Sequence, residues 1–506
     1  MRNSAVRMLE EAARHHANCI ALEDGDVLLT YAQYLERSQR IGTGLIRSDL
    51  HRDPVVIMLP KSADALCAFM GAMFAGCPYV PMNMGTPVSR SEKMFENLKP
   101  SAIVCYRAQA DEMTQAFPNI RVLSLEDLLE CEADLDALER SLSNVTDTDP
   151  IYIMYTSGST GMPKGVTIPH IGVIDYAHWV VERFGFDENT VMANQSAFYF
   201  DNSIFDIYGS MLCGCRLVIV PESMYMFPSK LPQYLRDHDI TSIFWVPSIM
   251  INVANSGALE GVDLPKLKNI AFCGEVMPNP QLNIWRRALP GRNYANLYGP
   301  TEISDVCCYY VVDREFADSD PLPIGIACEN MRIHILTEDN REAEVNEQGE
   351  LCVVGSGLAL GYWNAPEITA KVFVNNPLQP NVPQRMYRTG DLAYRNEEGL
   401  IMFQGRKDNQ IKLRGNRIEL GEIESAAMCV PGVENVCAVL DQENQQIVLF
   451  LETKCSFLLR RFNLELKKYV PNYMLPGKLV CMERLPHTPN DKIDRVALKN
   501  SLKESI

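Results

Sequence analysis

Short apolar runs rich in β-branched residues alternate along the chain with segments whose apolar residues repeat at helical spacing. The clearest helical segment covers residues 63–74. Strands are predicted at residues 55–60, 101–106, 121–125, 216–221, 242–247 and 269–274. Continuous apolar strands separated by helices are typical of parallel sheets that helices cover on both faces.

The pattern changes after Pro321. Strands predicted at residues 331–336, 350–355 and 400–405 indicate a β-rich subdomain, and a charged hairpin follows it. We therefore expect an α/β fold in which a large N-terminal domain, residues 1–407, holds two parallel-type sheets covered by helices and the β-rich subdomain. A small α+β C-terminal domain, residues 408–506, should begin near Asp408, with helices at residues 420–428 and 457–468.

Composition excludes several classes of protein. The chain has 506 residues, of which 47% are apolar and 22% charged, a globular balance that argues against disorder. With 47 Lys+Arg against 64 Asp+Glu, the net charge of −17 disfavours nucleic acid as a partner. Basic residues slightly outnumber acidic ones only after Asp408.

The 16 cysteines show no metal-ligand spacing, and a reducing compartment suits them. The N-terminus lacks the apolar core of a signal peptide, and its apolar spacing predicts one amphipathic helix instead. The long uncharged run at residues 65–82 contains Gly and Pro, so we interpret it as a buried helix followed by a strand, not a membrane span. We expect a cytoplasmic protein without a membrane partner.

The segment YTSGSTGMPKGV, residues 155–166, carries the strongest chemical signal. It follows an apolar strand and combines Gly, Ser and Thr with a lysine, Lys164. Backbone amides and hydroxyls in such a loop can surround phosphate oxygens. It is not the GxxxxGK[ST] P-loop, because Gly165 follows the lysine. Phosphate binding is predicted, with a flexible Gly/Ser loop as the alternative.

This loop resembles that of the adenylate-forming superfamily, specifically the amino-acid adenylation domains of nonribosomal peptide synthetases. Further matching stretches follow the family's order along almost the whole chain. They are LTYAQYL (29–35), AGCPYVPMN (75–83), NLYGPTE (296–302), GELCVVGSGLALGYW (349–363), YRTGDL (387–392), GRKDNQIKLRGNRIELGEIE (405–424), PNYMLP (471–476) and PNDKIDR (489–495).

The resemblance implies ATP and Mg²⁺ as cofactors, and it implies an ATP site. Residues expected to bind ATP are Thr156, Ser157, Gly158, Ser159, Thr160, Gly161, Lys164, Tyr298, Gly299, Thr301, Asp391, Arg406 and Lys492. Tyr298 would lie against adenine and Asp391 would accept the ribose hydroxyls. Glu302 would hold Mg²⁺, a hard cation that prefers oxygen ligands. Lys492, Thr156 and Glu302 are the expected catalytic residues.

The Lys492 loop departs from the family's pattern. The family usually has Asn-Gly-Lys, whereas this chain has Asn490-Asp491-Lys492. Asp tolerates positive φ less well than Gly, and it adds a negative charge beside the catalytic ammonium. The loop is therefore expected to be tuned differently.

The resemblance also implies that Asp201 binds the α-ammonium of an amino acid, since a buried carboxylate needs a cationic partner. The alternative is that Asp201 caps the helix that follows it. The remaining residues of the substrate site are expected to be Asn202, Phe205, Trp245, Ala271, Cys273, Gly274, Leu297, Asp305 and Val306.

These residues predict a small substrate: alanine of either hand, glycine or serine, with a short diamino acid or proline left open. The large Trp245 should shorten the pocket. Asp305 should either point to solvent or meet a polar or cationic substrate group. Locally the chain looks closest to stand-alone D-alanine–carrier protein ligases.

The family passes the activated acyl group to the phosphopantetheine thiol of a carrier protein. The C-terminal domain is expected to rotate about the hinge Asp408, bringing the hairpin at residues 411–417 to the site and removing Lys492. No carrier domain follows in this sequence, so we expect a separate carrier protein as partner. The alternatives are an acyl-CoA synthetase-type ligase of a non-amino carboxylic acid, and a non-catalytic nucleotide-binding relative.

Overall fold

The computed structural model describes residues 3–158, 162–408, 410–487 and 493–504. The chain divides into two compact units. Met1–Met84, Leu98–Met154 and Gly165–Lys407 form the first, while Gly85–Asn97, Tyr155–Lys164 and Asp408–Ile506 form the second. The predicted division into residues 1–407 and 408–506 stays a prediction.

A nine-stranded sheet dominates the first unit, and its central strands run parallel. In order across the sheet they are β15 (Ile326–Ala327), β14 (Cys308–Val311), β13 (Asn293–Tyr298), β12 (Asn269–Cys273), β11 (Ser242–Trp245), β9 (Val191–Asn194), β10 (Arg216–Ile219), β1 (Ile20–Asp24) and β2 (Val27–Thr30). The three strands predicted between residues 216 and 274 are β10, β11 and β12. Their continuous apolar sequence reflects burial on both faces.

A seven-stranded sheet, largely parallel, holds the strands predicted nearer the N-terminus. Its order is β18 (Gly361–Tyr362), β8 (Lys164–Pro169), β7 (Pro150–Thr156), β4 (Tyr79–Pro81), β3 (Val55–Ile57), β5 (Ala102–Cys105) and β6 (Arg121–Ser124). The prediction of two parallel-type sheets is confirmed.

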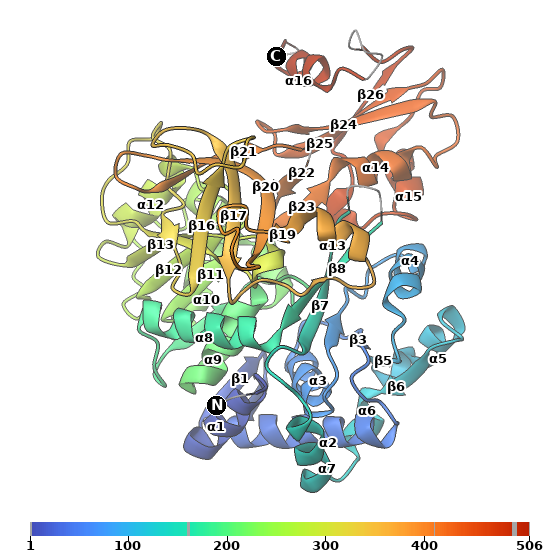
Figure 1. Ribbon diagram of the computed structural model, residues 1–506, viewed down its shortest axis with the longest axis vertical. Coiled ribbons are helices and arrows are strands. Elements are labelled where there is room, and N and C mark those ends of the chain that lie inside the picture. Colours follow the sequence, from blue (N-terminus) through green and yellow to red (C-terminus); the bar gives the residue numbers. More distant parts are fainter. Residues whose placement is uncertain (1–2, 159–161, 409, 488–492, 505–506) are drawn as a thin grey trace. The chain divides into compact units, whose positions relative to one another are not determined.

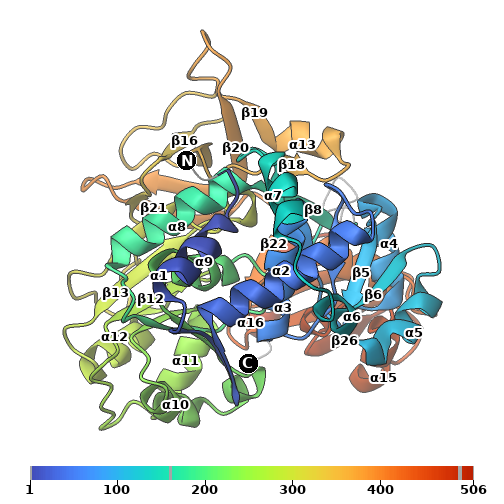
Figure 2. The ribbon, with the colours of Figure 1, turned by 90° about the horizontal axis from the view of Figure 1, so that it is seen from below.

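Helix α3 (Ala63–Phe74) has the predicted bounds, and its described side chains are almost all buried. Ser62 begins it by accepting a hydrogen bond from the Ala65 amide. Helix α2 (Tyr31–Arg47) runs alongside α3 (Figure 2). Gly71 permits this contact, because a Cβ there would lie 2.5 Å from Cγ2 of Ile41.

The remaining α-helices of the first unit follow in sequence order. They are α1 (Arg7–His16), α5 (Arg107–Ala116), α6 (Leu125–Leu129), α7 (Leu135–Ser143), α8 (His170–Phe184), α9 (Ser203–Cys213), α10 (Leu231–Asp237), α11 (Pro247–Asn255), α12 (Asn279–Ala288) and α13 (Pro366–Val372). The predicted amphipathic N-terminal helix is α1, whose Leu9 and Ala12 are buried.

The predicted β-rich subdomain is an antiparallel sheet of five strands (Figure 1). Strands β16 (Met331–Leu336), β17 (Gly349–Gly355), β20 (Arg385–Arg395) and β19 (Phe373–Asn375) follow one another, and β21 (Ile401–Arg406) also pairs with β20. This sheet brings Asp391 and Arg406 opposite each other on neighbouring strands.

The second unit contains the predicted hairpin and α+β elements. They are α4 (Val88–Leu98, all but its last residue), β22 (Gln410–Leu413), β23 (Asn416–Glu419), α14 (Leu420–Ala427), β24 (Asn435–Asp441), β25 (Gln446–Glu452), α15 (Leu459–Leu466), β26 (Lys478–Met482) and α16 (Arg495–Glu504). Within it, Arg90 of α4 forms a buried ion pair with Glu422 of α14. The sequence did not predict β26, which is half-exposed and carries Lys478 at its start.

Across the described ranges, no helix has the length and apolar character needed to cross a membrane. No disulfide bond joins the cysteines in the described ranges, and no group of three or more His, Cys, Asp or Glu side chains there is arranged to hold a metal ion.

Candidate functional site

The carboxyl ends of β11, β12 and β13 present a row of side chains on one face of the nine-stranded sheet. Phe244 pairs in register with Ala271, and Cys273 pairs with Leu297. Alternate residues of a strand share a face, so these four side chains line the same side. All four belong to one buried cluster, together with Val306. The predicted residues Ala271, Cys273 and Leu297 are therefore brought together, and Val306 belongs to the same large core.

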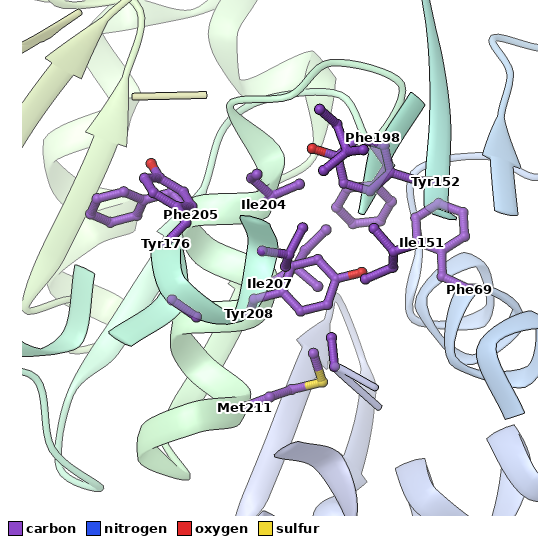
Figure 3. Packing of buried hydrophobic residues seen from close by; sticks show 14 of the residues in the cluster. Phe69, Ile151, Tyr152, Tyr176, Phe198, Ile204, Phe205, Ile207, Tyr208 and Met211 are labelled. Carbon is purple, nitrogen blue, oxygen red and sulfur yellow. The ribbon is translucent and has the colours of Figure 1, made fainter. Parts of the chain in front are cut away.

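Phe205 of α9 closes this row from above the sheet. Its ring stacks on that of Phe244, with centroids 4.4 Å apart and planes at 28°. The ring of Tyr176 on α8 makes an edge contact with that of Phe205, with centroids 6.5 Å apart, and Figure 3 shows the two rings together. The row is thus bordered by aromatic rings.

Trp245 does not contribute to this row, so the prediction that it shortens the pocket is wrong. Successive side chains of a strand alternate in direction, and Trp245 points to the opposite face from Phe244. There it belongs to a separate buried cluster with Phe272, and its indole N–H donates to the Ala193 carbonyl at 3.2 Å. Phe244, one residue earlier, occupies the position that sequence reasoning assigned to Trp245. The period-two alternation of the strand was the signal that would have identified it.

Asp201 and Asn202 lie in the turn that precedes α9. The Asp201 carboxylate accepts a hydrogen bond from the Asn202 amide at 3.1 Å, and no side-chain cap bond is made at the start of the helix. Both interpretations of Asp201, as ligand of a substrate ammonium and as helix cap, stay predictions.

The Asn202 side-chain amide faces Gly274, where a Cβ would lie 3.9 Å from Nδ2. Among the described residues, this buried Nδ2 has no hydrogen-bond partner. Asn202 therefore lies beside Gly274, and its side-chain amide is a buried donor at that point.

Asp305 is buried, which excludes the expected alternative that it points to solvent. The Tyr176 hydroxyl donates to its carboxylate at 2.7 Å. Ser304 and Asp305 both have positive φ, +61° and +80°. Gly299 makes room for this turn, because a Cβ there would lie 2.0 Å from the Asp305 carbonyl oxygen. Sequence reasoning missed Tyr176, since nothing in its helical segment distinguishes it from a core residue.

Tyr298, Asp391 and Arg406 form a second cluster. The Tyr298 hydroxyl donates to one oxygen of Asp391, and the Arg406 guanidinium donates to the other at 2.6 Å. Burial and then the nearby Asp391 carboxylate raise the pKa of Tyr298 well above its usual value. The phenol therefore stays protonated and continues to donate. The sequence predicted all three residues for one nucleotide, and the fold brings them into contact.

Glu302 follows Tyr298 in the same motif and is fully buried. The Tyr362 hydroxyl donates to its carboxylate at 2.7 Å. Thr301 is buried beside it in the same short 3₁₀ turn. A buried carboxylate suits Mg²⁺, which usually binds one or two protein carboxylates and completes its shell with phosphate and water oxygens.

The predicted phosphate loop lies in the second unit. The hydroxyl of Thr156 is buried without a partner among the described residues. Ser157 donates to the Arg417 carbonyl at 2.9 Å and accepts from the Glu419 amide at 3.2 Å. Gly158 is required for the turn, because a Cβ there would lie 1.8 Å from the Met162 carbonyl oxygen.

Lys164 begins β8 at the end of this loop. The predicted hinge residue, Asp408, accepts a hydrogen bond from the Gln410 amide at 3.2 Å. Ser159, Thr160, Gly161 and Lys492 lie outside the described residues.

Residues 9–363 match the AMP-binding enzyme family, and the chain belongs to that family. Tyrocidine synthase 1 of Brevibacillus parabrevis is 30% identical over 98% of this chain and 45% of its own length. An L-proline–[L-prolyl-carrier protein] ligase of Pseudomonas fluorescens is 30% identical over 97% of this chain and 98% of that protein. The chain spans between 6% and 45% of the length of several similar synthases.

The structure of NpsA-ThdA, an artificially fused adenylation–PCP di-domain from Klebsiella oxytoca, matches with a TM-score of 0.83. The match covers 100% of this chain and 97% of that chain at 21% identity, which establishes the shared fold. The expected closeness to D-alanine–carrier protein ligases stays a prediction.

Proposed function

We propose that this protein activates an amino acid with ATP as aminoacyl-AMP, releases pyrophosphate, and transfers the aminoacyl group to the phosphopantetheine thiol of a separate carrier protein. The observation that carries the proposal is that Asp201 immediately precedes Asn202, whose buried amide faces Gly274, the residue that follows Cys273 at the end of the apolar row. We propose that an ammonium-bearing acid binds here, with its charge on the Asp201 carboxylate and its side chain toward Phe205 and Leu297.

In the first step, an oxygen of the amino-acid carboxylate attacks the α-phosphorus, and the bond to the pyrophosphate oxygen breaks. The reaction needs positive charge and directed dipoles more than a base, since negative oxygens repel the carboxylate. Thr156, Ser157, Gly158, Ser159, Thr160, Gly161, Lys164 and Lys492 would supply these. Glu302 would hold the Mg²⁺ that accompanies ATP, and the ion would neutralise phosphate charge.

The nucleoside would be held by the Tyr298–Asp391–Arg406 cluster. A carboxylate has about four acceptor positions, so Asp391 can accept ribose hydroxyls while Tyr298 and Arg406 orient it. In the second step the pantetheine sulfur attacks the acyl carbon, AMP leaves, and the thiol proton is lost. Rotation of the C-terminal segment about Asp408 between the two steps is part of the proposal.

We propose a small amino acid as substrate, with alanine, glycine and serine as the first candidates. The stacked Phe205 and Phe244 rings support this, because they occupy the space that a long side chain would need. The similar carrier-protein ligases add proline as a competitor. The similarity to these carrier-protein ligases also supports a separate carrier protein as partner.

Amino-acid-dependent exchange of radiolabelled pyrophosphate into ATP tests the proposal. A panel of D- and L-amino acids should give signal with one or a few small members. Asp201→Ala should lose amino-acid activation while ATP affinity is kept, and Lys492→Ala should lose exchange while nucleotide still binds. Exchange that occurs only with fatty or aryl acids would reject amino-acid activation. The absence of exchange with every acid tested would reject it as well.

A further inference from the structure

Lys61 joins two parts of the first unit that are far apart in sequence. It lies in the turn between β3 and α3, and its ammonium reaches the carboxyl ends of β9 and β10 in the other large sheet. It donates to the carbonyls of Asn194 at 3.0 Å, Gln195 at 2.9 Å and Val220 at 3.1 Å. An ammonium has three donors, so these three carbonyls use its full capacity.

Asn194 and Gln195 are also held by hydrogen bonds of their own side chains. The buried Asn194 amide donates to Asp206 of α9 at 3.0 Å. The Gln195 side-chain oxygen accepts from the Val246 amide at 3.1 Å. Lys61, Asp206 and Val246 therefore hold residues 194 and 195, where the loop at residues 195–202 leaves β9 for α9, and Asp201 stands near the other end of that loop.

The charge of Lys61 is maintained although the side chain is largely enclosed. Burial lowers its pKa to about 8, while the carboxylates of Glu222, Asp206 and Asp24 act in the opposite direction. The Tyr225 ring lies 6.0 Å from the ammonium. The three carbonyl acceptors favour the protonated ammonium, which can donate to all of them.

We infer that Lys61 is a positioning residue for the amino-acid site, because it fixes where the loop that carries Asp201 leaves the sheet. The inference rests on the proposed function, which assigns the substrate ammonium to Asp201. Lys61 lies between β3 and α3, whereas the loop that carries Asp201 lies between β9 and α9. The hydrogen bonds of Lys61 go to backbone carbonyls. It acts on the substrate only through the path of the main chain.

The test compares Michaelis constants for the two substrates in pyrophosphate exchange. Lys61→Met keeps the length of the side chain but removes one donor from each of the three carbonyls, of which Asn194 keeps the Val220 amide at 3.3 Å and the Tyr225 hydroxyl at 3.4 Å. We expect the amino-acid KM to rise about tenfold or more and the ATP KM to change less than about twofold. Lys61→Arg keeps the charge, but a planar guanidinium cannot place its donors toward all three carbonyls as an ammonium does. An intermediate rise in the amino-acid KM is therefore expected.

Lys230→Met is the matched control, since Lys230 is exposed and its ammonium lies over the Phe227 ring, 5.0 Å from the centroid. It should leave both KM values unchanged. An unchanged amino-acid KM in Lys61→Met, or equal rises in both KM values, would overturn the positioning role. If Lys61→Met does not fold, the same comparison in Lys61→Arg decides. A wild-type enzyme without exchange for any amino acid would reject the proposed function itself.

Discussion

The hydroxyl of Tyr176 donates a hydrogen bond to the carboxylate of Asp305 at 2.7 Å, inside the buried cluster that also holds Phe205. Burial, followed by the Asp305 charge, raises the pKa of Tyr176 well above its usual value, so the phenol remains a donor. This hydrogen bond holds the side chain of Asp305, a residue whose backbone has positive φ.

Tyr176→Phe removes this donor and leaves Asp305 with one fewer partner. We expect a loss of about 1–3 kcal/mol in the free energy of unfolding, measured in urea, because a buried acceptor loses its bond. The amino-acid KM should rise as well, since Asp305 would be less firmly held. Tyr309→Phe, which alters a ring that packs on Trp179 from β14, is a suitable control and should leave the amino-acid KM unchanged. Equal KM values in both variants would contradict a role for the pair in substrate binding.

Asp391→Asn tests the nucleotide cluster. The substitution keeps the shape but weakens two acceptor bonds that come from Tyr298 and Arg406. Hydrogen bonds to charged groups contribute about 1.5–3 kcal/mol, so the ATP KM should rise about tenfold to a hundredfold. The amino-acid KM measured at saturating ATP should be nearly unchanged. Parallel titrations of the two substrates provide the comparison, and a selective loss of amino-acid affinity would contradict the assignment.

Phe244 and Trp245 provide a matched pair, because adjacent residues of β11 point to opposite faces. Phe244→Ala should widen the pocket and move the preference in pyrophosphate exchange toward longer amino acids. Trp245→Phe should lower stability by about 1–3 kcal/mol through lost packing and the lost bond to Ala193, with the preference unchanged. A changed preference in Trp245→Phe alone would restore the interpretation made from sequence.

His170 makes stability depend on pH. It is buried, its Nδ1 accepts the Ala5 amide at 3.3 Å, and burial lowers its pKa from 6.5 to about 4. Between these two values the unfolded chain binds more protons than the folded chain, so stability falls as pH falls through this window. The total loss is about 3 kcal/mol. His170→Asn keeps an acceptor but does not titrate, so its urea-unfolding free energy should decline less over the same window.

Much of the fold followed from the sequence because parallel strands buried on both faces are continuous apolar runs. Helix α3 and strands β10, β11 and β12 all lie where such runs predicted them. Strand β26 was missed because it is half-exposed and lacks that pattern. Within the site, motifs indicated Tyr298, Asp391 and Arg406. The antiparallel β20–β21 register places Asp391 opposite Arg406, and the Tyr298 hydroxyl at the end of β13 donates to the same carboxylate.

The errors in the site arose where the three-dimensional direction of a side chain decides its role. Trp245 was assigned by position in a motif, although strand alternation turns it away from Ala271. Tyr176 was not identified, because its contact with Asp305 joins segments 129 residues apart in the chain. Neither motif spacing nor hydrophobic pattern contains such long-range contacts.

Gly299 has a practical consequence for redesign of the pocket. The Asp305 carbonyl oxygen approaches Gly299 so closely that a Cβ there would lie 2.0 Å from it, and Asp305 itself has positive φ. Asparagine, which tolerates a left-handed conformation, and glycine, which accepts it freely, should therefore be accommodated at this position without shifting the surrounding turn. Libraries that vary substrate choice can begin at this one site, whereas bulky β-branched replacements there would disturb the frame itself.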